Sequence, residues 1–195
     1  MNASGTPAAG GGTDARTRRL IVLIAAIAVA PIVLAYVAYH YWPRTARTNY
    51  GELLPAQTLP RITGTTLAGA AFDSAGLRGK WVVLFAAPGE CDPVCRQALY
   101  ASRQARTIQN AERDRVQRVW LLIDAGMPAP SLLAEHPDLA VARVAPTALR
   151  ALPRGLQVMY LVDPLGNLVL AWPANPDIKA MSKDLSRLLH ASQIG

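Results

Sequence analysis

The chain has 195 residues, of which 51% are hydrophobic, and its formal net charge is +7 at pH 7. This hydrophobic content is sufficient for a packed core even after one membrane segment is set aside, which excludes an intrinsically disordered chain. Acidic and basic residues are mixed, and no basic run alternates with aromatic residues, so we expect no nucleic-acid partner.

The first 42 residues predict a tail and a membrane anchor. Residues 1–19 are rich in Gly, Ala, Ser and Thr, which is typical of a disordered cytoplasmic tail. Residues 20–42 are expected to form a transmembrane helix, because the run 20–39 carries no charge and has about the length that a bilayer requires. Tyrosines and Trp42 form an aromatic belt at its far end.

The charges around this segment predict its orientation. Arg16, Arg18 and Arg19 precede it, which favours an N-terminus in the cytoplasm. A cleaved signal peptide is the alternative, but the apolar run is long for one, and no small-residue cleavage site follows it. We therefore expect a single-pass protein of a bacterial inner membrane, with its soluble domain in the periplasm.

The remaining residues predict a linker over 43–58 and a folded domain over 59–195. Strands and helices alternate in this domain, which favours an α/β fold with a central mixed sheet flanked by helices. We expect a hairpin in 59–72 that turns near Gly64 or Gly69. Strands are expected near 81–87, 116–124, 156–163 and 168–172. Helices are expected from Arg96 to about Arg113, in 131–138 with Ser131 as the cap, and in 176–193. Residues 139–154 predict a strand followed by a helix.

The two cysteines lie where the strand beginning at Trp81 passes into a helix. Pro88 and Gly89 end the strand, and Cys91 and Cys95 follow at once. The free N–H groups and the dipole at a helix N-terminus stabilise a thiolate. A bridge across four residues closes a small loop and constrains the unfolded chain little, so a purely structural disulfide is the weaker interpretation. The pattern predicts a redox or soft-metal site, with both sulfur atoms on one exposed surface.

This order of elements resembles a thioredoxin-like domain, and the C-x-x-x-C spacing of Cys91-Asp-Pro-Val-Cys95 resembles the SCO/SenC family of cytochrome c oxidase assembly factors. The lead-in 77–85 and the segment Tyr160-Leu-Val-Asp-Pro-Leu-Gly are also similar to that family. The resemblance implies an assembly factor that delivers copper or maintains the redox state of cysteines. It also implies a partner that is an oxidase subunit or another periplasmic cysteine protein.

The chain departs from both related site types. The copper-binding histidine of the SCO family aligns with Gly155, and the proline of thioredoxin-type reductases aligns near Gln157. His136 would replace the missing histidine only if its loop folded over the cysteines. Three hypotheses therefore stay open: copper handling through Cys91 and Cys95, thiol–disulfide exchange with Cys91 as nucleophile and Cys95 as resolving thiol, and a non-catalytic interaction module.

Overall fold

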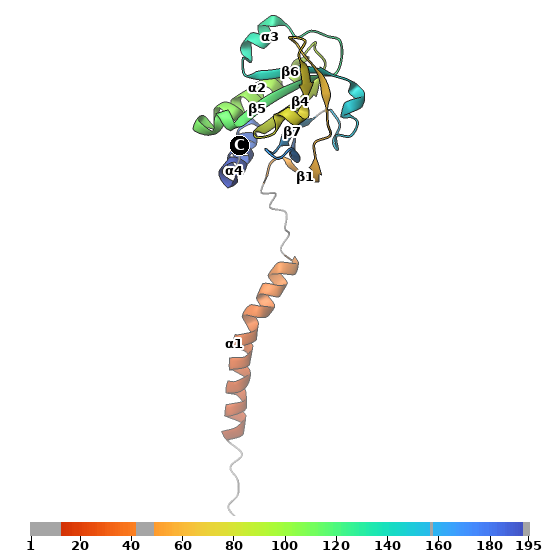
Figure 1. Ribbon diagram of the computed structural model, residues 1–195. Coiled ribbons are helices and arrows are strands. Elements are labelled where there is room, and N and C mark those ends of the chain that lie inside the picture. Colours follow the sequence, from red (N-terminus) through yellow and green to blue (C-terminus); the bar gives the residue numbers. More distant parts are fainter. Residues whose placement is uncertain (1–12, 42–48, 157, 193–195) are drawn as a thin grey trace, which may run out of the picture. The chain divides into compact units, whose positions relative to one another are not determined.

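The computed structural model describes residues 13–41, 49–156 and 158–192 (Figure 1). The chain divides into two compact units, Met1–Arg47 and Thr48–Gly195.

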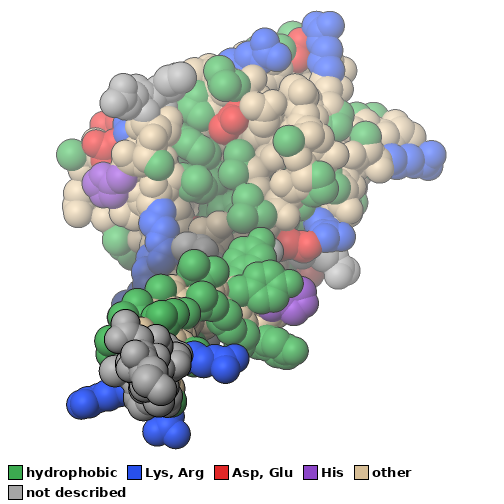
Figure 2. All heavy atoms as spheres, turned by 90° about the horizontal axis from the view of Figure 1, so that it is seen from below, with side chains coloured by type: hydrophobic (Ala, Val, Ile, Leu, Met, Phe, Trp, Pro, Cys, Tyr) green, Lys and Arg blue, Asp and Glu red, His purple; other side chains and the backbone are tan. Residues whose placement is uncertain are grey.

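The first unit contains one long helix, α1 (Thr13–Tyr41), with Pro31 inside it. Its segment Ala15–Tyr41 is long and apolar enough to cross a membrane, a property that a signal sequence near the N-terminus shares. Figure 2 shows hydrophobic side chains around this helix, with Lys and Arg side chains near its N-terminal end.

The prediction of a disordered tail over 1–19 was wrong for residues 13–19, which belong to α1. Alanine and arginine are good helix formers, so the helix continues N-terminally beyond the apolar run. Residues 1–12 and Trp42 lie outside the described residues.

The second unit is built on one mixed sheet with the strand order β1-β8-β7-β4-β5-β6-β2-β3. The strands are β1 (Glu52–Thr58), β2 (Thr63–Thr66), β3 (Ala71–Asp73), β4 (Trp81–Ala87), β5 (Val116–Leu122), β6 (Leu139–Val144), β7 (Val158–Val162) and β8 (Asn167–Pro173). The helices are α2 (Pro93–Thr107), α3 (Pro130–Glu135) and α4 (Ile178–Ala191), with 3-10 turns η1 (Ser74–Leu77), η2 (Asn110–Arg115) and η3 (Pro146–Leu149). Strands β4, β5 and β6 are parallel, and β7 and β8 are antiparallel to their neighbours.

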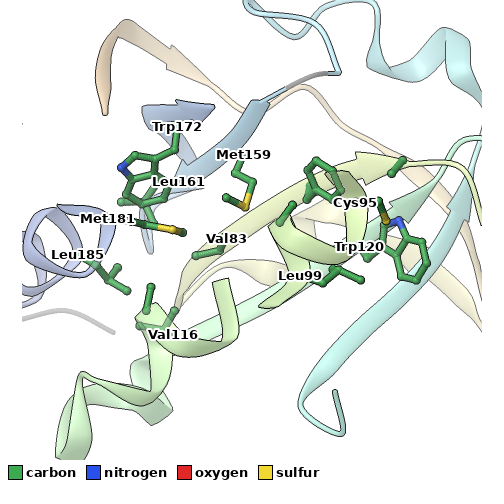
Figure 3. Packing of buried hydrophobic residues seen from close by; sticks show 14 of the residues in the cluster. Val83, Cys95, Leu99, Val116, Trp120, Met159, Leu161, Trp172, Met181 and Leu185 are labelled. Carbon is green, nitrogen blue, oxygen red and sulfur yellow. The ribbon is translucent and has the colours of Figure 1, made fainter. Parts of the chain in front are cut away.

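The centre of the sheet is buried on both faces. All seven residues of β4 are buried, as expected for a strand covered on both sides. One face packs against α2 and α4, where Leu99, Met181 and Leu185 meet side chains of the sheet such as Val83 (Figure 3). The opposite face is covered by Ile62, Leu77, Leu149 and Leu152, which come from η1, η3 and the loops beside them. This arrangement confirms the predicted α/β sheet.

The prediction of a linker over 43–58 was wrong for residues 52–58, which form β1 and pair with β8. The ladder is irregular between Leu53 and Gln57, around Pro55. Proline is tolerated on an edge strand but obscures the strand pattern in the sequence.

Of the two turn positions predicted for the hairpin, the structure has Gly69, and two predicted helix boundaries were corrected. The hairpin turns at Gly69, which has a φ of +81°, whereas Gly64 lies within β2. Helix α2 ends at Thr107, and Asn110, with a φ of +53°, begins η2. Helix α3 is preceded by Ala129 at the cap position, and Ser131 lies inside it.

Candidate functional site

Cys91 and Cys95 lie at the carboxyl end of β4, in the loop that leads into α2 and in its first turn. The structure brings the two cysteines together in a disulfide bond, with a Cα–Cα distance of 5.2 Å. The strand supplies a rigid support from one side, and the first turn of α2 supplies one from the other. This is the junction at which the sequence placed them.

The prediction that both sulfur atoms share an exposed surface was wrong, because both residues are largely buried. Cys91 is 8% exposed and Cys95 is 2% exposed. Cys95 points into the core cluster that also holds Leu99 and Trp120 (Figure 3). The more exposed residue is therefore Cys91, which is the cysteine chosen as nucleophile.

The start of α2 is held by a side-chain cap. The backbone N–H of Cys95 donates to Oδ1 of Asp92 at 2.7 Å. Pro93 occupies the first turn, where its missing N–H costs little. The carbonyl of Cys91 accepts a bond from Nε of Arg96 at 3.2 Å. These contacts fix the backbone on both sides of the disulfide.

A second loop supports the segment before Cys91. The N–H of Gly89 donates to Oδ1 of Asp124 at 2.8 Å, and the N–H of Gly126 donates to the same oxygen at 3.2 Å. A Cβ on Gly89 would overlap the backbone of Gly126. Nε of Arg143 donates to the carbonyl of Asp124 at 2.9 Å and so holds the second loop in turn.

This contribution of Asp124 and Gly89 was not predicted from the sequence. One signal was available, because Asp124 follows β5 just as the cysteines follow β4, and these parallel strands end at the same edge of the sheet.

Among the described residues, His136 does not join the cysteines in a group that could hold a metal ion. It lines a pocket beside the first turns of α2, together with Pro93 and Arg96. Burial and, after it, the charges of Arg118 and Arg103 lower the pKa of His136 below its usual value of 6.5. Its Nδ1 is buried and has no hydrogen-bond partner. His136 is therefore a buried side chain whose surroundings favour its neutral form.

The segment before β7 carries Gly155, the position predicted to stand in place of the SCO histidine. Gly155 has a φ of +70°, and its carbonyl accepts a bond from the hydroxyl of Tyr160 at 2.9 Å. The pairing of Phe85 with Met159 brings this segment to the end of β4 that leads to the cysteines. Gln157, near which the reductase proline is expected to align, lies outside the described residues.

The donors near the disulfide do not form a three-ligand copper site. Among the described residues, no group of three or more His, Cys, Asp or Glu side chains is placed to hold a metal ion. After reduction, the two cysteines would offer a pair of soft thiolate donors.

Comparison with known proteins places this domain in a family. A family model described as a transmembrane-like, thioredoxin-like, C-terminal domain matches residues 81–192, more than half of the chain. The chain belongs to this family. The match covers β4, both cysteines and all elements up to α4. A search of curated proteins finds no match.

Solved structures with the same fold include Sco proteins. Copper-bound ScoI from Arabidopsis thaliana is 18% identical, with a TM-score of 0.59 over 70% of this chain and 100% of that one. Copper-bound yeast Sco1 is also 18% identical, with a TM-score of 0.60 over 71% of this chain and 96% of that one. Apo Sco1 from Thermus thermophilus is 21% identical, with a TM-score of 0.56 over 75% of this chain and 98% of that one. These matches confirm the thioredoxin-like fold and the predicted resemblance to the Sco proteins at the level of the fold.

Proposed function

We propose that this protein is a membrane-anchored, SCO-like assembly factor that acts by thiol–disulfide exchange on a cysteine-containing partner. In this proposal α1 anchors the chain in a bacterial inner membrane and the thioredoxin-like domain lies in the periplasm. The partner is a cytochrome c oxidase subunit or another periplasmic cysteine protein. The observation that carries the proposal is the Cys91–Cys95 disulfide at the start of α2, with Cys91 the more accessible residue.

The exchange follows from the chemistry of two adjacent cysteines. A partner thiolate attacks Sγ of Cys91, a mixed disulfide forms, and Sγ of Cys95 leaves as a thiolate. A second partner thiol then attacks the mixed disulfide, and Cys91 leaves as a thiolate. The partner dithiol loses two electrons and becomes a disulfide, and the Cys91–Cys95 pair is reduced. The reverse sequence reduces a partner disulfide.

Trapping of the mixed disulfide tests this proposal. In Cys95→Ser no resolving thiol is present, so we expect Cys91 to form a lasting adduct with partner cysteines in cells. Cys91→Ser is the matched control and is expected to form far less adduct, because Cys95 is 2% exposed. Equal trapping by both variants, or by neither, would contradict exchange through Cys91.

Copper handling is a second candidate, favoured by the closeness of the two sulfur atoms. After reduction, two thiolates side by side suit Cu(I), although a third protein ligand is not placed beside them in the described residues. We expect the reduced protein to bind one Cu(I) and the double variant, Cys91→Ser with Cys95→Ser, to bind none. Equal Cu(I) binding by the two proteins in a competition titration would remove the copper function and leave the exchange proposal intact.

A further inference from the structure

Helix α4 carries a row of basic side chains on its exposed face. Lys179, Lys183, Arg187 and His190 are all exposed. Their spacings of four, four and three residues place them on one side of an α-helix. The opposite side is buried, with Met181, Leu185 and Leu189 in the core. We call the four exposed residues the α4 basic row.

The basic row borders a shallow groove between α4 and the end of α2. The groove is also lined by Ile108, which is 51% exposed, and by Ser182 and Ser186. No acidic side chain lines it among the described residues. Surfaces that bind the headgroup region of a bilayer combine cationic side chains with exposed apolar ones, as this groove does.

Helix α4 also binds the first residues of the domain. The backbone N–H groups of Tyr50 and Gly51 donate to the carboxylate of Asp184 at 3.0 and 2.7 Å. The N–H of Asp177, the residue before α4, donates to the hydroxyl of Tyr50 at 3.1 Å. Figure 1 shows α4 beside the start of the domain. The beginning of the domain is thus attached to α4.

The covalent connection to α1 is short. Residues 42–49 separate Tyr41, the last residue of α1, from Tyr50. Nine residue steps span at most about 30 Å. With α1 in a bilayer, this tether limits how far the domain can move from the membrane, and such tethering raises the effective concentration of the lipid for the row.

We propose that the α4 basic row docks the domain on anionic phospholipid headgroups of the membrane that holds α1. This inference rests on the anchoring role proposed for α1 and is independent of the chemistry at Cys91 and Cys95. At moderate ionic strength, salt screens the attraction between opposite charges beyond about 10 Å. The basic row must therefore come close to the headgroups in order to bind them. Each lysine or arginine near an anionic surface strengthens binding roughly fivefold.

A fluorescent label on α4 tests the docking in the full-length protein. The chain has only two cysteines, and they form the disulfide, so Ser186→Cys provides one reactive thiol in the groove. The labelled protein is reconstituted through α1 into vesicles that contain lipids with spin-labelled headgroups. We expect strong quenching in vesicles containing phosphatidylglycerol. Little quenching is expected in pure phosphatidylcholine, or in phosphatidylglycerol vesicles at about 1 M salt, where the Debye length falls to about 3 Å.

Charge reversal provides the decisive comparison. Lys179→Glu with Lys183→Glu should reduce the population of the quenched state more than tenfold, because two attractions become repulsions. Lys80→Glu with Arg150→Glu changes the net charge equally but lies outside the groove, and should leave the quenching unchanged. Quenching that is absent in anionic vesicles, or is equal in both lipids, overturns the proposal. Flotation of the vesicles with the protein verifies insertion of α1, so failed anchoring is distinguished from failed docking.

Discussion

Gly89 is the residue whose lack of a side chain shapes the site most directly. The loop before Cys91 approaches the loop of Gly126 so closely that a Cβ on Gly89 would overlap its carbonyl group. The obstacle is backbone, so it cannot rotate away as a side chain can. The two loops must therefore separate if any larger residue occupies this position.

The first prediction concerns Gly89→Ala. We expect the free energy of unfolding to fall by about 1–3 kcal/mol, the usual cost of overpacking. Because Gly89 also bonds to Asp124, the disulfide loop should become more accessible, and its reduction by dithiothreitol should be faster. Gly76→Ala is the control, since a Cβ there meets no atom within 4 Å and should be nearly neutral. Equal effects of the two substitutions in urea unfolding would contradict this explanation.

His136 links stability to pH. Its pKa is lowered in the folded protein by burial and by Arg118 and Arg103, so below pH 6.5 the unfolded chain binds more protons at this site than the folded one. The stability therefore falls as the pH falls below about 6.5. Burial raises the pKa of Asp138, but Arg118 and other contacts outweigh burial, so this pKa is lowered from 3.8. The effect of Asp138 on stability therefore begins only at more acidic pH than that of His136.

The second prediction is that His136→Gln removes most of the loss of stability between pH 6.5 and 5. Denaturant unfolding followed by tryptophan fluorescence measures it at each pH. His190→Gln is the matched control, because His190 is an exposed histidine on α4. If the wild type and His136→Gln show the same slope of stability against pH, another group is responsible.

At the scale of elements, α4 joins the N-terminal segment of the domain to the sheet. The buried carboxylate of Asp184 accepts bonds from Tyr50 and Gly51 and also from Nε1 of Trp172 on β8, at 3.1 Å. One side chain thus satisfies three donors from two parts of the fold. A buried acceptor of this kind is costly to remove, because its donors lose their partners.

The third prediction is that Asp184→Ala lowers the free energy of unfolding by about 2–4 kcal/mol, as expected for several unpaired buried donors. It should also expose the chain near Gly51 to limited proteolysis. Asp177→Ala is the comparison on the same helix: it removes only the cap that accepts from the N–H of Ala180 and should cost about 1 kcal/mol. A smaller effect at Asp184 than at Asp177 would show that the N-terminal segment is held in another way.

For the whole molecule, the disulfide contributes little to the architecture. Cys91 and Cys95 are four residues apart, and the fold is held by an extended sheet with a core on each face. Loop-closure entropy for so short a loop is worth about 2 kcal/mol.

The fourth prediction is that the reduced protein keeps its fold. Reduction, or the double substitution Cys91→Ser with Cys95→Ser, should lower the unfolding free energy by no more than about 2 kcal/mol. The near-ultraviolet circular dichroism of the buried tryptophans should keep its native form. Cooperative loss of that signal on reduction would assign the disulfide a structural role and weaken the exchange proposal.

The local features of this domain could be predicted from the sequence. The strand at Trp81, the helix after the cysteines and the apolar face of α4 all follow from residue periodicity and from breakers such as Pro88, which act over a few residues. The cysteine pair at a strand–helix junction follows from the same signals. The sequence therefore predicted the α/β sheet and the position of the disulfide within it.

Only the tertiary structure decided the features that depend on distant residues. Strand β1 forms because it pairs with β8. Cys95 is buried because its side of α2 packs against the sheet. Asp124 supports Gly89 from 35 positions away, while His136 lines a pocket with Pro93 and Arg96 of α2. Such contacts are set by how strands and helices pack, and no local pattern of side chains records which remote partner each residue will meet.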